Sequence, residues 1–173
     1  EDDLDLVSTA KDKGYQVLYN KEDLANAEGQ KLLGLFSPDG LEYKDSEPRL
    51  PDLVTKALGI LSTSKNGFFL MVEGSQIDWA GHANDEEYLI TEQLDFEQVM
   101  KVAMDFAEAD GNTLVVVTAD HETGGFTLSA AGKDFAAYDD YKEIGPRFAT
   151  GSHSATLIPV FAYGPGSEEF IGI

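Results

Sequence analysis

The stretch VVVTADHETGG, residues 115–125, joins a run of β-branched side chains to an Asp-His pair with two glycines close behind. Three valines and a threonine in succession favour a strand that is buried on both faces of a parallel sheet. Asp120 and His121 therefore fall where that strand ends, and Gly124 and Gly125 fit a turn after it. In a parallel α/β sheet, ligands bind beyond the carboxyl ends of the strands, so this position is a candidate site.

Two other segments show a similar arrangement. The apolar run FFLMVEG predicts a buried strand that ends at Glu73, and Asp78 and His82 follow it. The segment TGSHSATLIPV places His153 next to the last predicted strand. All three histidines of the chain thus lie beside a strand end or beside a carboxylate at such an end.

Three of these side chains have the spacing and chemistry of a zinc site. Asp78 and His82 are four residues apart, so on a helical turn both point to one face and can bind a single ion. His153 would add a second imidazole. Three protein ligands with one open position are typical of catalytic rather than structural zinc.

The other candidates would serve further ions. Asp120 and His121 are adjacent, so only a turn could direct both side chains at one ion. Glu73 offers oxygen alone and suits a harder ion such as magnesium. The alternative is that Asp120 and His121 form a helix cap with a solvated imidazole, and that Glu73 caps a turn. With 32 acidic residues, some carboxylates lie near histidines by chance, but their joint placement at strand ends favours metal binding.

The composition restricts the partners of the chain. Its formal net charge is −20, from 32 acidic and 12 basic residues, and the resulting field repels nucleic acid and anionic lipid. The same field repels a phosphate ester unless bound cations invert the local potential. The chain has no cysteine, which excludes disulfides and thiolate chemistry. No apolar run reaches the roughly 18–20 residues of a membrane span.

Helical and strand-like patterns alternate along the 173 residues. This alternation predicts a single α/β domain over residues 1–173, with three α/β/α layers and a mostly parallel central sheet. Strands are expected at residues 15–20, 31–36, 68–74, 114–120 and 157–163. Helices are expected near residues 4–13 and 21–29, from Pro51 to residue 62, and at residues 86–109, the last with a buried stripe of Ile90, Leu94, Val99, Val102 and Phe106. Residues 128–150 are predicted to be an irregular surface insertion.

These segments also carry a resemblance to a known family. MVEGSQIDWAGHAND, NTLVVVTADHETGGF and TGSHSATLIPVFAYGPG resemble the three metal-binding segments of the alkaline phosphatase family, and they occur in the family's order. KLLGLF, EPRLPDLVTKALGIL and the long helix around Leu94 and Asp95 are similar to the family as well. The resemblance covers most of the chain and is weakest over residues 128–150.

The resemblance implies two zinc ions and one magnesium ion, held by six side chains that match the family's motifs. These are Asp78, His82 and His153 for the first zinc, Asp120 and His121 for the second, and Glu73 for magnesium. Trp79 matches a position beside the metal site where family members have lysine, histidine or tryptophan. The resemblance implies that Trp79 tunes phosphate affinity and pH dependence.

The sequence also departs from the family. Family enzymes attack phosphorus with a serine in an Asp-Ser-Ala-type motif, steady the phosphate with an arginine, and use another aspartate for the second zinc and the magnesium. This sequence contains no counterpart of these groups. Asp45 and Ser46 lie in a polar loop and precede Glu and Pro, and neither Arg49 nor Arg147 matches a catalytic position. The chain therefore resembles an incomplete, carboxyl-terminal portion of an alkaline phosphatase that also stops short of the family's last element.

The expected reaction of the complete enzyme is hydrolysis of small phosphate monoesters through a phosphoserine intermediate, in an extracytoplasmic, periplasmic setting. The isolated chain is expected to bind zinc weakly and to be inactive alone. One alternative is a related superfamily hydrolase, such as a phosphodiesterase, a sulfatase-like enzyme or a phosphoglycerate mutase. Another is a noncatalytic metal-binding module that binds calcium or a partner, although calcium sites use oxygen ligands rather than imidazoles. The resemblance is compatible with a homodimer.

Overall fold

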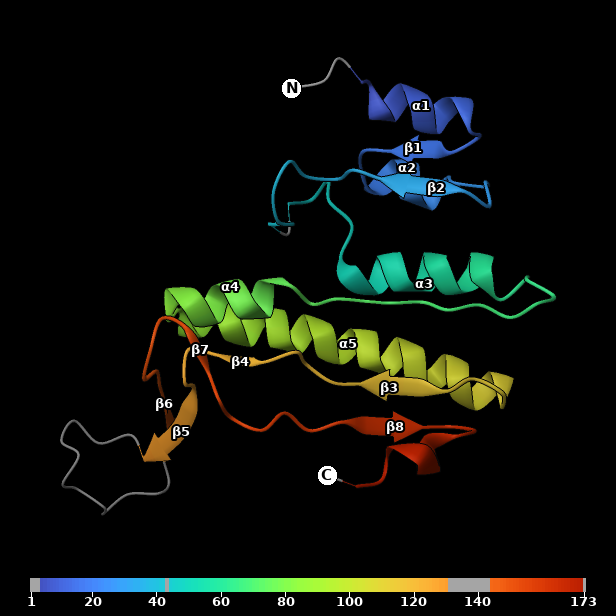
Figure 1. The fold of residues 1–173 in the computed structure, drawn as a ribbon. Helices are drawn as coiled ribbons and strands as arrows, with labels where there is room; N and C mark the ends of the chain where they lie inside the picture. The colour runs from blue at the N-terminus through green and yellow to red at the C-terminus, as the bar shows by residue number, and fades with distance from the viewer. Residues whose placement is uncertain (1–3, 43, 131–143, 173) are drawn as a thin grey trace. The chain divides into compact units, whose positions relative to one another are not determined.

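A computed structural model describes residues 4–42, 44–130 and 144–172 of the chain (Figure 1). The chain divides into two compact units, Glu1–Val72 and Glu73–Ile173, which are described in turn. The single domain over residues 1–173 stays a prediction.

The first unit alternates short helices and strands in the predicted order. Its elements are α1 (Leu6–Asp12), β1 (Gln16–Leu18), α2 (Lys21–Ala25), β2 (Leu32–Gly34) and α3 (Leu50–Leu61). Strands β1 and β2 pair in parallel, and a small core contains Leu18, Leu24 and Ala27. Pro51 lies in the first turn of α3, where its missing N–H removes no helix hydrogen bond.

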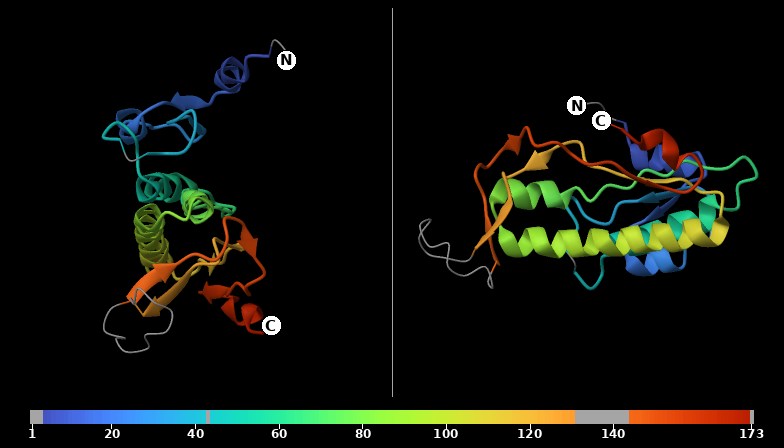
Figure 2. Two further views of the ribbon diagram at one scale, coloured as in Figure 1. Left: turned by 90° about the vertical axis from the view of Figure 1, so that its left-hand side faces the viewer. Right: turned by 90° about the horizontal axis from the view of Figure 1, so that it is seen from below.

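Two helices open the second unit. α4 (Gln76–Ala83) and α5 (Glu86–Asp110) pack against each other (Figure 1, Figure 2). The Asp85 side chain accepts a hydrogen bond from the Tyr88 N–H and so caps the start of α5, while Gly111 ends the helix in the left-handed conformation. These bounds confirm the long helix predicted over residues 86–109. Within the described residues, no helix is both long and apolar enough to cross a membrane.

The buried face of α5 differs from the predicted stripe. Val99 is buried, as predicted, but Ile90 and Leu94 are 45% and 55% exposed. The helix instead turns Glu92 and Asp95 inward, and these two share one face with Val99 because they lie seven and four residues before it. The prediction was wrong here because a hydrophobic pattern gives no weight to carboxylates, which are rarely buried.

The strands of the second unit pair in antiparallel fashion. The pairs are β3 (Val115–Val117) with β8 (Phe161–Tyr163), β4 (Glu122–Thr123) with β7 (His153–Ser154), and β5 (Thr127–Ala130) with β6 (Ile144–Arg147). A 3-10 helix, η1 (Ser167–Phe170), follows β8. Strands β5 and β6 lie largely within the segment 128–150 that was predicted to be irregular. Residues 131–143 of that segment lie outside the described residues.

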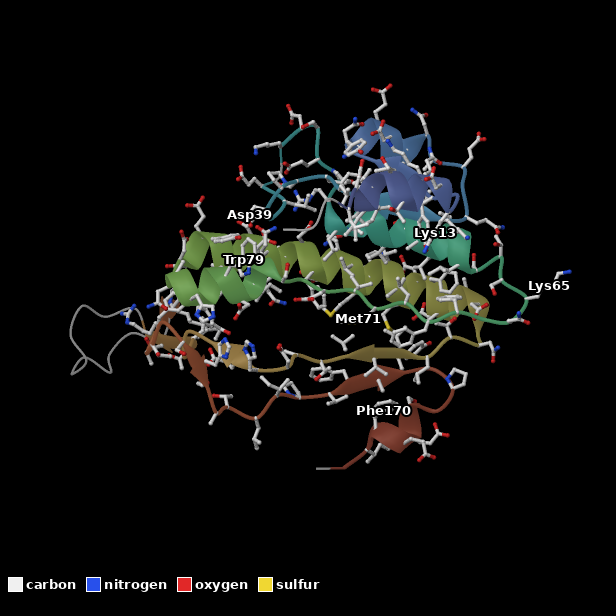
Figure 3. All side chains as sticks on the ribbon, turned by 45° about the horizontal axis from the view of Figure 1, so that its top comes forward. Lys13, Asp39, Lys65, Met71, Trp79 and Phe170 are labelled. Carbon is white, nitrogen blue, oxygen red and sulfur yellow. The ribbon has the colours of Figure 1, made fainter. Side chains whose placement is uncertain are left out.

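The α/β class is confirmed, but the mostly parallel central sheet is not seen among the described residues. They form four two-stranded sheets, of which β1–β2 is parallel and the other three are antiparallel. The apolar run 68–74 forms no strand, and its Phe69 and Met71 are 87% and 74% exposed (Met71 is labelled in Figure 3). A segment forms a strand only where a neighbouring strand supplies hydrogen bonds. Apolar side chains in such a segment are buried only where other layers of the protein cover them.

The close approach of β8 to the end of α5 and the start of β3 gives a first testable prediction. Gly164 follows β8 with φ +102°, and a Cβ there would lie 2.2 Å from the Thr113 carbonyl oxygen. Gly164→Ala must strain the backbone or separate these segments. We expect it to lower the free energy of unfolding by about 1–3 kcal/mol.

Gly59→Ala is the matched control, because Gly59 lies within α3 and nothing lies within 4 Å of an added Cβ. Helix propensity predicts a gain of up to about 1 kcal/mol for this change. Urea denaturation followed by circular dichroism measures both variants. A Gly164→Ala variant as stable as the wild type would contradict the described packing.

Candidate metal centre

The helix α4 presents Asp78 and His82 on one face, one turn apart, as the spacing predicts. His82 Nε2 lies 3.4 Å from Asp78 Oδ1. The helix packs closely on β4, because Gly81 is buried and an added Cβ would lie 2.8 Å from the Thr123 carbonyl oxygen. Glycine at this position thus lets the face that carries Asp78 reach β4.

The strand β7 brings His153 to the same place. It pairs with β4 so that His153 lies opposite Thr123. His153 Nε2 lies 3.1 Å from His82 Nε2, although the two residues are 71 positions apart in the sequence. The same nitrogen lies 3.6 Å from Asp78 Oδ1. The structure therefore unites the three residues that the sequence assigns to one zinc site.

The three candidate ligand atoms have separations close to those that a tetrahedral ion requires. Zinc binds nitrogen and oxygen ligands at about 2.0–2.1 Å, which places neighbouring ligands of a tetrahedron roughly 3.3–3.4 Å apart. The distances between Asp78 Oδ1, His82 Nε2 and His153 Nε2 are 3.1–3.6 Å. A tetrahedral ion held by this one oxygen and two nitrogens would have a fourth position for another ligand. The donor set therefore fits zinc.

The tautomer of His82 also suits a metal ligand. Its Nδ1 lies 2.8 Å from the Gly151 carbonyl oxygen, and because a carbonyl can only accept, Nδ1 must carry the proton. In the neutral ring, Nε2 is then unprotonated and faces Asp78 and His153. A hydrogen bond from the ring nitrogen that does not bind the metal is the usual means of orienting a histidine ligand.

Thr123 links this group to the next pair of candidates. Its hydroxyl lies 2.6 Å from Asp78 Oδ1 and donates to that carboxylate oxygen. The hydroxyl oxygen lies 3.1 Å from His121 Nδ1 and accepts its proton, so His121 Nε2 is also unprotonated in the neutral ring. Sequence analysis missed Thr123. Its signal is the two-residue spacing from His121, which places both side chains on one side of an extended segment.

The bend before β4 holds the second pair. His121 Nε2 lies 3.2 Å from Asp120 Oδ2, and the two residues lie outside regular strand structure, as predicted. The His121 ring stacks on His153, with centroids 3.5 Å apart and 19° between the planes. Asp78, His121 and His153 each offer one ligand atom within 4.8 Å of the others. The two predicted metal groups are therefore neighbours.

Glu73 and Trp79 lie differently. In the part of the chain that the structure describes, no hydrogen bond or ion pair joins the exposed Glu73 carboxylate to the other five candidates. Trp79 follows Asp78 on α4 and is half exposed (labelled in Figure 3). Asp45 and Ser46 lie in a turn of the first unit, in the loop between β2 and α3, as predicted.

Glu122, between His121 and Thr123, is another residue that sequence analysis missed. Burial has the largest single effect and raises the pKa of its carboxyl. Hydrogen bonds from the Ser154 hydroxyl and from the N–H groups of Phe126 and Gly125, together with the nearby His121, outweigh burial and hold that pKa below its ordinary value. Glu122 is therefore an ionised, half-buried group beside the candidate ligands.

Comparison with known proteins identifies the family. Residues 1–142 match the family model described as alkaline phosphatase. The chain belongs to the alkaline phosphatase family. It is 34% identical to alkaline phosphatase 3 of Bacillus subtilis (strain 168), in a match that covers 98% of this chain and 52% of that protein.

Solved structures of this family share the fold. Alkaline phosphatase from the Antarctic bacterium TAB5 superposes with a TM-score of 0.85 and 46% identity, over 99% of this chain and 52% of that chain. A variant of the TAB5 enzyme with Mg bound gives a TM-score of 0.82 at 45% identity, with the same coverage. The resemblance inferred from the sequence and the alkaline phosphatase-like α/β fold are thus confirmed. The chain spans about half the length of these relatives.

The contact between Gly81 and β4 gives the prediction for this site. Gly81→Ala should push α4 away from Thr123 and displace Asp78, although no candidate ligand is altered. We expect zinc binding to weaken about 10–100-fold, the usual effect of disturbing the support of a metal ligand. Isothermal titration calorimetry measures the affinity, with Gly59→Ala as a control. Equal affinities for all three proteins would show that this contact does not position the site.

Proposed function

We propose that this chain supplies most of the metal ligands of an alkaline phosphatase that hydrolyses phosphate monoesters. The observation that carries the proposal is the convergence of Asp78, His82 and His153 at 3.1–3.6 Å. These residues come from two segments that match the family's metal-binding motifs. Such convergence in a family named for this activity favours hydrolysis over a structural role.

We assign the ligands as the sequence predicts. Asp78, His82 and His153 would hold a first zinc ion, Asp120 and His121 would contribute to a second, and Glu73 would bind magnesium. Carboxylate oxygen and unprotonated imidazole nitrogen suit zinc, and a lone carboxylate suits magnesium. When bound, these ions would neutralise phosphate charge and make an oxygen nucleophile available near neutral pH.

The residues of this chain have defined tasks in that reaction. Asp78, His82 and His153 would fix the first ion and leave its open side to the substrate. The Thr123 hydroxyl would fix the positions of the Asp78 and His121 side chains relative to each other, since it forms hydrogen bonds with both. The serine nucleophile and phosphate-binding arginine of the family have no counterpart among these 173 residues, so the phosphoserine step would use groups outside them.

The charge of the chain supports a site that needs cations. With a formal net charge of −20, the protein repels a phosphate ester. Two zinc ions and one magnesium ion would add about six positive charges where the ester binds. Metal binding would therefore both attract the substrate and relieve repulsion among the site's own carboxylates. From the family resemblance alone, we place the whole protein outside the cytoplasm, in the periplasm.

The ligand assignment is tested by zinc titration of the chain. His82→Ala removes one of three ligands and should weaken zinc binding by more than about 100-fold, because it takes away a direct ligand rather than its support. Calorimetry compares it with the wild type. The control is Asp105→Asn, which removes one negative charge from an exposed position on α5 and alters no candidate ligand. Unchanged zinc affinity in His82→Ala would refute the assignment.

A phosphatase assay tests whether the nucleophile lies outside these 173 residues. The chain alone should turn over p-nitrophenyl phosphate negligibly in zinc and magnesium, because it lacks the serine and arginine of the family's motif. Release of nitrophenolate is followed by absorbance before and after chelation of the metals. Robust turnover that chelation abolishes would show that the nucleophile lies within these residues after all.

A further inference from the structure

We infer that Glu122 is a positioning residue for the metal centre. Its carboxylate is not among the candidate ligands, yet it ties the turn after β4 to β7 and thereby holds His121 and His153 in place. The inference rests on the proposed function, because it concerns how these two imidazoles are presented to a metal ion.

The Glu122 carboxylate joins segments that are far apart in the sequence. One oxygen accepts a hydrogen bond from the Phe126 N–H at 2.9 Å, and the other accepts one from the Gly125 N–H at 3.1 Å. The second oxygen also accepts the hydroxyl proton of Ser154, which lies 32 residues further along the chain. One side chain therefore connects the tight turn that follows β4 to the strand that carries His153.

These contacts bear directly on two candidate ligands. Glu122 follows His121, and Ser154 follows His153. In the β4–β7 pair, Glu122 lies opposite Ser154, and Thr123 lies opposite His153. Each strand has only two residues, so the backbone alone specifies the register weakly. A slip of one residue would turn His153 to the opposite face, and the bond between Glu122 and Ser154 opposes that slip.

Glu122 faces away from the metal position. Successive side chains along an extended segment point to opposite sides. Thr123 points toward Asp78 and His121, to which its hydroxyl bonds, so Glu122 points to the other side. Its oxygens are already occupied by three donors. These observations distinguish a residue that positions ligands from one that binds the ion.

A carboxylate is required at this position because its partners are all donors. Each oxygen faces a backbone N–H, so whichever way a glutamine amide is turned, its NH2 group meets another donor. The change costs both a hydrogen bond and the desolvation of an unpaired group. The turn it holds is tight, since Gly124 and Gly125 have φ of +93° and +59° and a Cβ on Gly125 would lie 2.8 Å from Ala149 Cβ.

The test uses two variants with matched controls. Glu122→Gln disrupts the turn and the link to β7, whereas Ser154→Ala leaves the turn intact and removes that link together with the hydroxyl's contacts to Thr156. The controls are Glu108→Gln, which removes an exposed carboxylate on α5, and Ser152→Ala, which alters an exposed serine on the other side of His153. Zinc affinity is measured by calorimetry, and the visible spectrum of the cobalt-loaded chain reports ligand geometry separately from affinity.

We expect Glu122→Gln to weaken zinc binding about 10–100-fold and Ser154→Ala to weaken it less, both with altered cobalt spectra. The controls should match the wild type, and circular dichroism should show the same helix content throughout. Wild-type affinity and spectra in both variants would overturn the inference. If Glu122→Gln fails to fold, Ser154→Ala alone decides. A wild-type chain that binds no zinc would instead refute the proposed function.

Discussion

The pairing of β4 with β7, packed against α4 at Gly81, is the constraint on which the site depends. Two residues of each strand form the pair, and the helix can reach it only because Gly81 has no side chain to meet the Thr123 carbonyl. The helix supplies one histidine and one aspartate, and β7 supplies the second histidine. This contact brings together His82 and His153, which are 71 positions apart in the sequence and whose Nε2 atoms lie 3.1 Å from each other.

The hydrogen bonds around the site determine which imidazole nitrogens carry lone pairs. His82 Nδ1 and His121 Nδ1 both donate to neighbouring groups, so in the neutral rings their Nε2 atoms carry lone pairs, that of His82 beside His153 and that of His121 beside Asp120. His153 Nε2 lies within 3.6 Å of both His82 Nε2 and Asp78 Oδ1, so either a proton on His153 Nε2 or a metal ion among the three atoms would satisfy their lone pairs. The same hydrogen bonds that orient the two rings therefore leave their Nε2 atoms able to bind a metal ion.

The sequence predicted those parts of the site that follow local rules. Asp78 and His82 share a face because four residues make about one helical turn, and Asp120 and His121 lie between β3 and β4 at a bend, as two adjacent side chains directed at one place require. The two-residue spacing from His121 is a signal for Thr123, but Glu122 could not be recognised, because its role depends on a strand pair in which its partner Ser154 is 32 positions away. Tertiary pairing of this kind leaves no periodic signal in the sequence.

The same reasoning explains the outcome for the fold. Long, strongly patterned segments such as α3 and α5 were located correctly, since caps and spacing specify them locally. The run 68–74 was predicted to be a strand from its apolar side chains, but strand formation also requires neighbouring strands, and Phe69 and Met71 are exposed. A hydrophobic pattern likewise does not predict the burial of the two carboxylates of α5, Glu92 and Asp95.

The central claim is that Asp78, His82 and His153 form one metal site. Anomalous diffraction at the zinc edge from crystals of the chain soaked in zinc at neutral pH tests it most directly. The account predicts a peak about 2.0–2.1 Å from Asp78 Oδ1 and from Nε2 of both histidines. Anomalous peaks remote from these three atoms, in crystals where the site is accessible to solvent, would contradict it.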